Sequence, residues 1–279
     1  MRPRAAAFDR YTSRGFTIVE AAVVLLIVGL VVGAIAIPLA TQIESRRIED
    51  TNRMLDLAQE KLLAYASKYG YFPCPADALS NGREPAGTDH TTGACPTWQG
   101  FLPAAALGWS PLDAEGYALD AWGGAGNRVR YAISNETIAG ITNPFTRVNG
   151  MANAGMGPVA SAALFRVCGS GSGVNAGVDC GTAQTLASNA AVVTWSVGPN
   201  AASGGTSIHE AQNPNPNGGS ADPIFVSRPR SDASSAEFDD LVRWIPSSIL
   251  VGRLRVLGMM TPSGSGSGGA GGGGGTYGP

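Results

Sequence analysis

The longest apolar segment of the chain, residues 21–40, contains no charged side chain. About 20 such residues, rising about 1.5 Å each in a helix, are long enough to cross the hydrocarbon core of a bilayer. Gly29 and Gly33 lie four residues apart in it, and this spacing lets membrane helices approach closely. Pro38 removes one backbone hydrogen bond and should bend the helix. The pattern predicts a membrane-spanning helix over residues 16–40.

The helical pattern continues beyond the apolar segment. From Ile48 to Tyr69, apolar and small side chains recur at alternating steps of three and four residues, which indicates one buried helix face. Charged side chains, such as Arg53 and Glu60, occupy the opposite face. Gly70 then ends the pattern. We expect residues 41–70 to form the amphipathic half of one long helix.

Four later segments have the composition of β-strands: residues 128–133, 163–168, 191–197 and 238–245. In the first of them, apolar residues alternate with Arg128 and Arg130, as in a strand with one buried and one solvated face. Residues 249–258 fit a short helix or a strand equally well. One long helix followed by several strands predicts an α+β fold, in which the helix packs on a small antiparallel sheet. Residues 71–262 would form this globular domain.

The C-terminal end has a different composition. Residues 263–275 are all Gly or Ser except Ala270. Such a segment behaves as a flexible coil and cannot bury a core. We expect residues 263–279 to be a disordered tail that carries no site.

The charge distribution restricts the function and the orientation. The first 15 residues hold four arginines and one aspartate, so the remainder has 15 basic and 20 acidic side chains (19−4 and 21−1), a charge near −5. Nothing after residue 15 is strongly basic, which argues against nucleic acid as the main partner. Basic residues ahead of an apolar segment stay in the cytoplasm. The bulk of the chain should therefore lie on the opposite side of the membrane.

The four cysteines agree with an extracytoplasmic position. They allow three pairings. We favour Cys74 with Cys95 and Cys168 with Cys180, because each pair closes a Gly-rich, loop-like segment. A zinc site is the alternative, but the chain has no CxxC pair and only two histidines. The composition therefore favours disulfides.

The chain carries no pattern typical of an enzyme. Its serines lie outside any GxSxG turn, and two histidines without a neighbouring motif make a poor source for a catalytic triad. The Gly-rich segment 168–173 lacks the Lys-Ser/Thr ending of a phosphate-binding loop. We therefore predict that the protein is not an enzyme.

The stretch Arg14-Gly15-Phe16-Thr17-Ile18-Val19-Glu20 joins the basic leader to the apolar segment. It places a Gly-Phe pair before the segment and one carboxylate four residues after the Phe. This arrangement resembles the N-terminus of type IV prepilins and of type II secretion pseudopilins. The resemblance implies that a prepilin peptidase cuts between Gly15 and Phe16, removes the leader 1–15, and methylates the new amino group of Phe16. The stretch Asp120-Ala121-Trp122-Gly123 and the strand after it also look like the region that follows the long helix in pseudopilin-type proteins.

Alternatives to this interpretation exist for the segment and for Glu20. A secretory signal peptide has a shorter apolar region, of about 7–15 residues, with its cut after that region, and a plain signal anchor has no cut at all. A carboxylate at the edge of a membrane segment costs several kcal/mol if it is unpaired. The resemblance implies that Glu20 meets the amine of Phe16 of a neighbouring subunit and so sets the register. Otherwise Glu20 stays in the headgroup layer without a partner.

The resemblance implies a pilin-like fold and a structural function. The chain would be a subunit of a type IV pilus or of a type II secretion pseudopilus, and the size of the mature chain and the position of Pro38 favour a minor pilin or pseudopilin. Its partners would be the prepilin peptidase, other pilin or pseudopilin subunits, inner-membrane lipid and the assembly platform. It would be a single-pass protein of the bacterial inner membrane with a periplasmic globular domain, or part of an extracellular pilus. The alternative function is a membrane-anchored extracytoplasmic binding or adhesion domain that does not polymerise.

We predict no cofactor and no metal, and calcium is the one candidate that the sequence leaves open. Some pseudopilins hold calcium in a loop comparable to the one beside Asp239 and Asp240. Calcium needs about 6–8 oxygen ligands, and no compact loop here has several acidic residues at ligand spacing. The alternative is that both aspartates are solvated strand or turn residues.

Overall fold

The computed structural model describes residues 15, 17–201, 205, 207–213, 223–233 and 236–256, with only the backbone for residues 34–39. Most of the predicted leader and the whole Gly/Ser-rich tail therefore lie outside the described residues. The chain divides into two compact units, residues 1–47 and 48–279.

One helix, α1 (Ile18–Tyr69), accounts for most of the helical structure. It ends where the sequence predicts. Gly70 has a positive φ of 82°, and its amide donates to the carbonyl of Ala66. A glycine adopts this left-handed conformation without steric cost, so it terminates the helix. The backbone at Pro38 is helical.

The buried face of α1 lies in the second unit and is formed by every third or fourth residue. Its members are Thr51, Leu55, Ala58, Leu62 and Ala66. The predicted face included Tyr69 as its last member, but this side chain is 44 % exposed. The spacing of a helix is 3.6 residues, so the buried face continues from Leu62 to Ala66, and the tyrosine falls on its border.

The sheet is mixed, and most of its pairings are antiparallel. Its strands are β1 (Gln99–Phe101), β2 (Arg130–Ile133), β3 (Phe165–Cys168), β4 (Thr185–Ser196), β5 (Ile224–Val226) and β6 (Leu241–Pro246). The long strand β4 pairs with β2, β3 and β6, all antiparallel. The same stretch of β4, residues 192–195, pairs with β2 and with β6, so these two strands lie on its opposite edges. Among the described strands, only β3 and β5 run parallel.

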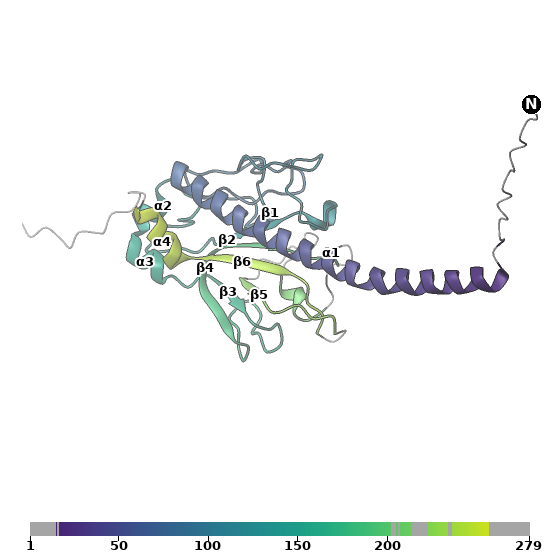
Figure 1. The fold of residues 1–279 in the computed structure, drawn as a ribbon. Helices are drawn as coiled ribbons and strands as arrows, with labels where there is room; N and C mark the ends of the chain where they lie inside the picture. Colours follow the sequence, from purple (N-terminus) through teal and green to yellow (C-terminus); the bar gives the residue numbers. More distant parts are fainter. Residues whose placement is uncertain are drawn as a thin grey trace, which may run out of the picture. The chain divides into compact units, whose positions relative to one another are not determined.

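The second half of α1 crosses one side of this sheet, and the helices α2 (Gly150–Ala154), α3 (Met156–Ser161) and α4 (Ser247–Val256) gather at one end of it (Figure 1). The second half of α1 contributes Leu55 and Leu62 to a core that also contains Ile133 of β2, Val192 of β4 and Ile245 of β6. The helices α2, α3 and α4 add residues to the same core. The described part of the undecided segment, residues 249–256, is thus helical. The 3-10 turns η1 (Ala125–Asn127) and η2 (Glu210–Gln212) lie in loops.

A second apolar cluster contains the strand residues that alternate with those of the first. Ala132, Val193 and Trp195 pack there with Phe165 and Phe225. Both faces of β2 and of residues 190–196 of β4 are consequently buried. The prediction of helices and strands that share one fold with a mainly antiparallel sheet is confirmed, whereas a wholly antiparallel sheet is wrong, because β3 and β5 run parallel.

The prediction that residues 128–133 have a solvated face is wrong. Arg130 is only 1 % exposed, and its guanidinium lies 4.1 Å from the ring centre of Phe101. Arg128 is buried between Asp113 at 2.9 Å and Glu115 at 2.6 Å. Stacking on aromatic rings and pairing with carboxylates allow these side chains to leave water. Apolar and arginine side chains therefore do alternate along this strand, but both faces of the strand are buried.

Candidate functional site

The first turn of α1 contains the candidate assembly residue Glu20. The helix begins at Ile18, directly after Thr17, and the amide of Glu20 donates to the hydroxyl of Thr17 at 3.2 Å. A Thr followed three residues later by a Glu is the sequence of a capping box. The hydroxyl of Thr17 thus caps the first turn at the amide of Glu20, a local contact that sequence reasoning missed, although the Thr-x-x-Glu spacing was visible. The side chain of Glu20 is exposed, as is Gly15, whereas Phe16 lies outside the described residues.

The helix surface that follows is apolar on all sides and exposed. Every residue from Ile18 to Gly33 is exposed, and Leu25 and Leu30 remain 72 % and 67 % accessible. A helix in a globular protein hides its apolar side chains on one face. An exposed apolar surface of this extent indicates contact with lipid or with other protein. Among the described residues of the first unit, none covers these side chains.

Gly29 and Gly33 lie one turn apart on this exposed surface. A Cβ added at either position would meet no atom within 4 Å. The glycines therefore leave space that no described part of the chain fills, as a close helix contact requires. The side chain of Pro38, the third candidate of the helix, lies outside the described residues. Within the part of the chain that the structure describes, no helix is long and apolar enough to cross a membrane.

The calcium candidates Asp239 and Asp240 belong to a buried acidic cluster. Both are less than 9 % exposed, so the expectation of solvated positions is wrong. Together with Glu210 of η2 they place three carboxylate oxygens within 4.8 Å of one another. Glu210 lies 29 residues before Asp239 in the chain, and therefore no local spacing could have identified it as a third member.

Hydrogen bonds hold two members of this acidic cluster. The side-chain amide of Asn213 donates to Asp240 at 2.7 Å, and the backbone amide of Asp239 donates to Glu210 at 2.9 Å. Asn200 also donates to the Glu210 carboxylate. In contrast, Asp239 Oδ1 is fully buried without a hydrogen-bond partner in the described part of the structure. A buried, unpartnered carboxylate oxygen is costly and needs an explanation.

Burial also changes the ionisation of the cluster. Burial, followed by the nearby charge of Glu210, raises the pKa of Asp239 to about 7. Burial raises the pKa of Asp240 well above its ordinary value, although the bond from Asn213 acts in the opposite direction. The negative charges of Asp239 and Asp240 are therefore not stable by themselves. Either protons or a cation must compensate them.

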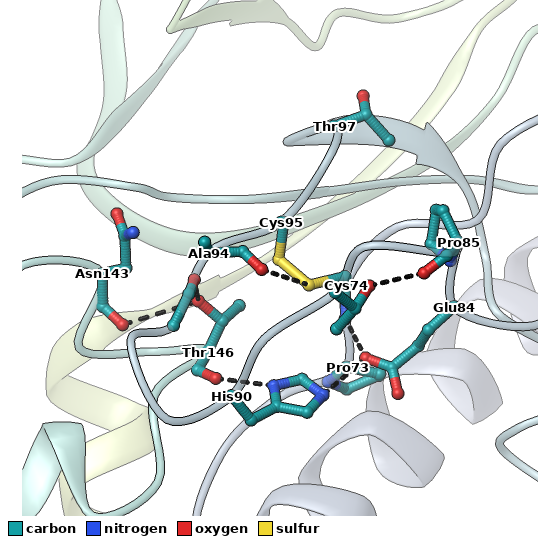
Figure 2. The surroundings of a disulfide bond; sticks show 12 residues. Pro73, Cys74, Glu84, Pro85, His90, Ala94, Cys95, Thr97, Asn143 and Thr146 are labelled. Carbon is teal, nitrogen blue, oxygen red and sulfur yellow. Dashed lines mark hydrogen bonds and ion pairs between the residues drawn. A yellow bond between two sulfur atoms is a disulfide. The ribbon is translucent and has the colours of Figure 1, made fainter.

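The cysteines form the sequential pairs favoured from the sequence, Cys74 with Cys95 and Cys168 with Cys180. Figure 2 shows the first disulfide beside Glu84 and His90. The amide of Cys74 donates to Glu84 at 2.7 Å, and His90 lies between Glu84 and the carbonyl of Thr146. The second disulfide lies in a smaller buried cluster with Phe238.

The Asp-x-Trp-Gly stretch has a structural role. The carboxylate of Asp120 accepts bonds from the amides of Trp122 and Gly123 and from the side chain of Asn127. It also accepts a hydrogen bond from the hydroxyl of Ser196, at the end of β4. Asp120 therefore joins this turn to the central strand. Burial raises its pKa, although all of these bonds favour the charged form.

No protein-family model matches this chain, and no curated protein or solved structure does either. The resemblance of residues 14–40 to prepilins therefore depends on the motif itself.

Proposed function

We propose that this chain is a structural subunit of a type IV pilus or of a type II secretion pseudopilus. It would be made as a precursor, cut between Gly15 and Phe16, methylated at Phe16, and assembled through its N-terminal helix. The observation that carries the proposal is the combination of this cleavage motif with Glu20 and an exposed apolar helix surface over residues 18–33.

The energetics of that surface favour an assembly function. Burial of one Leu, Ile or Val side chain contributes about 1.5–3 kcal/mol. The segment exposes many such side chains, so a large driving force is available for contact with lipid or with the helices of neighbouring subunits. Gly29 and Gly33 would let those helices approach closely. A pilin uses both environments in turn, because it is stored in the inner membrane and then enters the filament.

The charge of Glu20 would fix the position of each subunit relative to the next one in the filament. A charged pair with the amine of Phe16 in the next subunit can form in only one position, and it is lost if the subunits slip. The globular unit is large and carries several long loops, which favours a minor pilin or pseudopilin. Its partners would be the peptidase, the assembly platform and other subunits, and its globular unit would lie in the periplasm or on an extracellular pilus.

The first test is the mass of the N-terminal peptide of the protein from its native membrane. We expect a mature chain that starts at N-methylated Phe16. A chain that starts at Met1, or after about residue 40, contradicts the proposal. A Gly15→Leu variant should accumulate as the uncut precursor if the peptidase recognises this bond.

The second test isolates the charge of Glu20 from the Thr-x-x-Glu spacing at the start of the helix. A Glu20→Gln variant keeps a side chain suited to a capping box but loses the charge. We expect normal processing and strongly reduced incorporation into filaments. Glu60→Gln, an exposed change on the same helix, is the matched control and should assemble normally. If Glu20→Gln assembles as well as the control, the non-polymerising binding or adhesion domain is the better function.

A calcium ion bound by Glu210, Asp239 and Asp240 is the second part of the proposal. Calcium–oxygen distances of about 2.3–2.6 Å place two ligand oxygens on opposite sides of the ion at most about 5 Å apart. One oxygen from each of the three carboxylates lies within 4.8 Å of the other two, so the three satisfy this limit. The fully buried Asp239 Oδ1 would gain a partner. Three carboxylates form an all-oxygen donor set, which suits a hard cation. Calcium fits a buried site better than magnesium, which keeps several of its waters.

Thermal unfolding of the full chain tests this site. We expect calcium to raise the Tm relative to an excess of chelator, and magnesium to have a smaller effect. Asp239→Asn should remove the response, whereas Asp232→Asn, whose side chain is 84 % exposed, should retain it. If calcium has no effect and Asp239→Asn stabilises the protein, the cluster shares protons and does not bind a cation.

A further inference from the structure

Four residues with metal-binding side chains meet at the first disulfide (Figure 2). One ligand atom from each of Cys74, Glu84 and His90 lies within 4.8 Å of the other two. The sulfur of Cys95 is bonded to that of Cys74 and so belongs to the same place. All four residues come from one segment of the chain, residues 74–95, and the two cysteines are its ends.

His90 is oriented as a metal ligand. Its Nδ1 lies 2.8 Å from the carbonyl oxygen of Thr146. A carbonyl oxygen can only accept, so Nδ1 carries the proton of the neutral ring and Nε2 keeps a free lone pair. Histidines that bind a metal through one nitrogen usually donate the other N–H to such a carbonyl or to a carboxylate. Thr146 therefore fixes the tautomer in which Nε2 can bind a cation.

Nε2 of His90 faces a second ligand and no hydrogen-bond donor. It is fully buried, has no hydrogen-bond partner in the described part of the structure, and lies 2.9 Å from Oε1 of Glu84. The lone pair of a neutral imidazole and a carboxylate repel each other at this distance unless a cation, either a proton or a metal ion, joins them. The amide of Cys74 donates to the same Oε1 at 2.7 Å and so holds Glu84 in place.

These distances are close to those of a tetrahedral zinc site. Zinc binds thiolate sulfur at about 2.3 Å and imidazole nitrogen or carboxylate oxygen at about 2.0–2.2 Å, which places neighbouring ligand atoms about 3.3–3.8 Å apart. The Nε2–Oε1 distance of 2.9 Å and the limit of 4.8 Å for the three ligand atoms lie on either side of these values. Two thiolates, one imidazole and one carboxylate form a donor set that suits zinc better than calcium or magnesium.

We propose that the reduced form of this segment binds one zinc ion through the thiolates of Cys74 and Cys95, Nε2 of His90 and the carboxylate of Glu84. A disulfide sulfur carries no thiolate charge, so the zinc ion and the disulfide exclude each other. Chains are synthesised with free thiols, so the zinc form precedes the disulfide form. Zinc then holds both ends of segment 74–95 together before the disulfide does. This site does not depend on the assembly role of the N-terminal helix.

Oxidation converts the zinc form into the disulfide form that the structure shows. The oxidant is a thiol–disulfide exchange protein in its disulfide state. The thiolate of one cysteine attacks this disulfide, and the thiolate of the other then displaces the oxidant from the mixed disulfide. The bond between Cys74 and Cys95 forms, the oxidant leaves as two thiols after it takes up two protons, and Zn²⁺ is released. A thiolate bound to zinc is less available for the first attack, so zinc slows the oxidation.

The first test is thiol alkylation of the full chain in detergent micelles. A phosphine reduces both disulfides, and the sample then receives either zinc or an excess of chelator. Peptide mass spectrometry measures the modification of each cysteine. We expect zinc to prevent alkylation of Cys74 and Cys95. Cys168 and Cys180 are the internal control and should react equally in both samples, because neither belongs to a metal-ligating group among the described residues.

The second test removes one ligand at a time and keeps all four cysteines. Competition with a chelating dye measures the zinc affinity of the reduced chain. We expect His90→Gln and Glu84→Gln each to lower it by more than about tenfold, because even residues that only orient a ligand contribute about 10–100-fold. Glu136→Gln, an exposed change on a different loop, should keep the original affinity. Equal protection of all four cysteines by zinc, no protection of Cys74, or an unchanged affinity in His90→Gln would each overturn the proposal.

Discussion

The two ends of α1 have opposite surroundings although they belong to one helix. Residues 18–33 expose apolar side chains all round, and no part of the first unit covers them among the residues described. Residues 51–66 bury one face in the core of the second unit and present charges on the other. Hydrophobicity alone therefore does not predict burial within a chain. The spacing of the apolar residues does predict burial, because only residues 51–66 confine their apolar side chains to one face of the helix.

The two ends of α1 should differ most in how much a Leu→Ala substitution lowers the free energy of unfolding of the second unit. Leu62→Ala removes a fully buried side chain beneath the sheet, and we expect it to lower the free energy of unfolding by about 2–5 kcal/mol. Leu26→Ala removes a side chain of the same type that is 65 % exposed, and should change it by less than about 0.5 kcal/mol. Denaturant unfolding followed by tryptophan fluorescence measures both. Equal effects would show that residues 18–33 also belong to the folding core.

Loss of the second disulfide should have an intermediate effect. Cys168 and Cys180 are 12 residues apart, and closure of such a loop stabilises a fold by about 3 kcal/mol in the chain-entropy model. A Cys168→Ser/Cys180→Ser variant should unfold at a correspondingly lower denaturant concentration. If the chain is processed at Gly15 as proposed, this processing should be unaffected, as the mass of the N-terminal peptide will report. A processing defect in this variant would contradict the independence of the two units.

The smallest effect should come from the polar side of the second segment. Asp56 pairs with Arg243 of β6 at 3.1 Å, and their side chains are 63 % and 39 % exposed. Exposed pairs of this kind contribute about 0.2–1 kcal/mol. Asp56→Asn should therefore hardly change the unfolding midpoint at physiological salt. A loss above about 1.5 kcal/mol would mean that this pair, and not the apolar face alone, attaches the helix to the sheet.

The sequence predicted the elements that have a strong period. The end of α1 at Gly70, the segments that contain β2, β3, β4 and β6, and the sequential disulfides follow from periodicity, glycine and cysteine spacing. It did not predict the burial of Arg130, because the aromatic ring that covers this side chain lies on another strand. The short strands β1 and β5 have three residues each, too few to show alternation.

The candidate sites were predictable only where their residues are neighbours in the chain. Gly15, Thr17 and Glu20 are read directly from one stretch of sequence. The cluster around Asp239 needed Glu210, and the contacts of His90 needed Thr146, 56 residues away. Such groups meet through the tertiary fold, whose long-range pairings no local pattern encodes.

The central position of β4 has a consequence for the order of folding during synthesis. The helix face at Leu55 and Leu62 is synthesised early, but its partners on β4 and β6 follow more than 120 residues later. Chains dominated by such distant contacts fold slowly and expose apolar surface in the meantime. While the chain is still emerging, this face has no sheet to cover it. We therefore expect the nascent chain to depend on a holding chaperone until β6 has been completed.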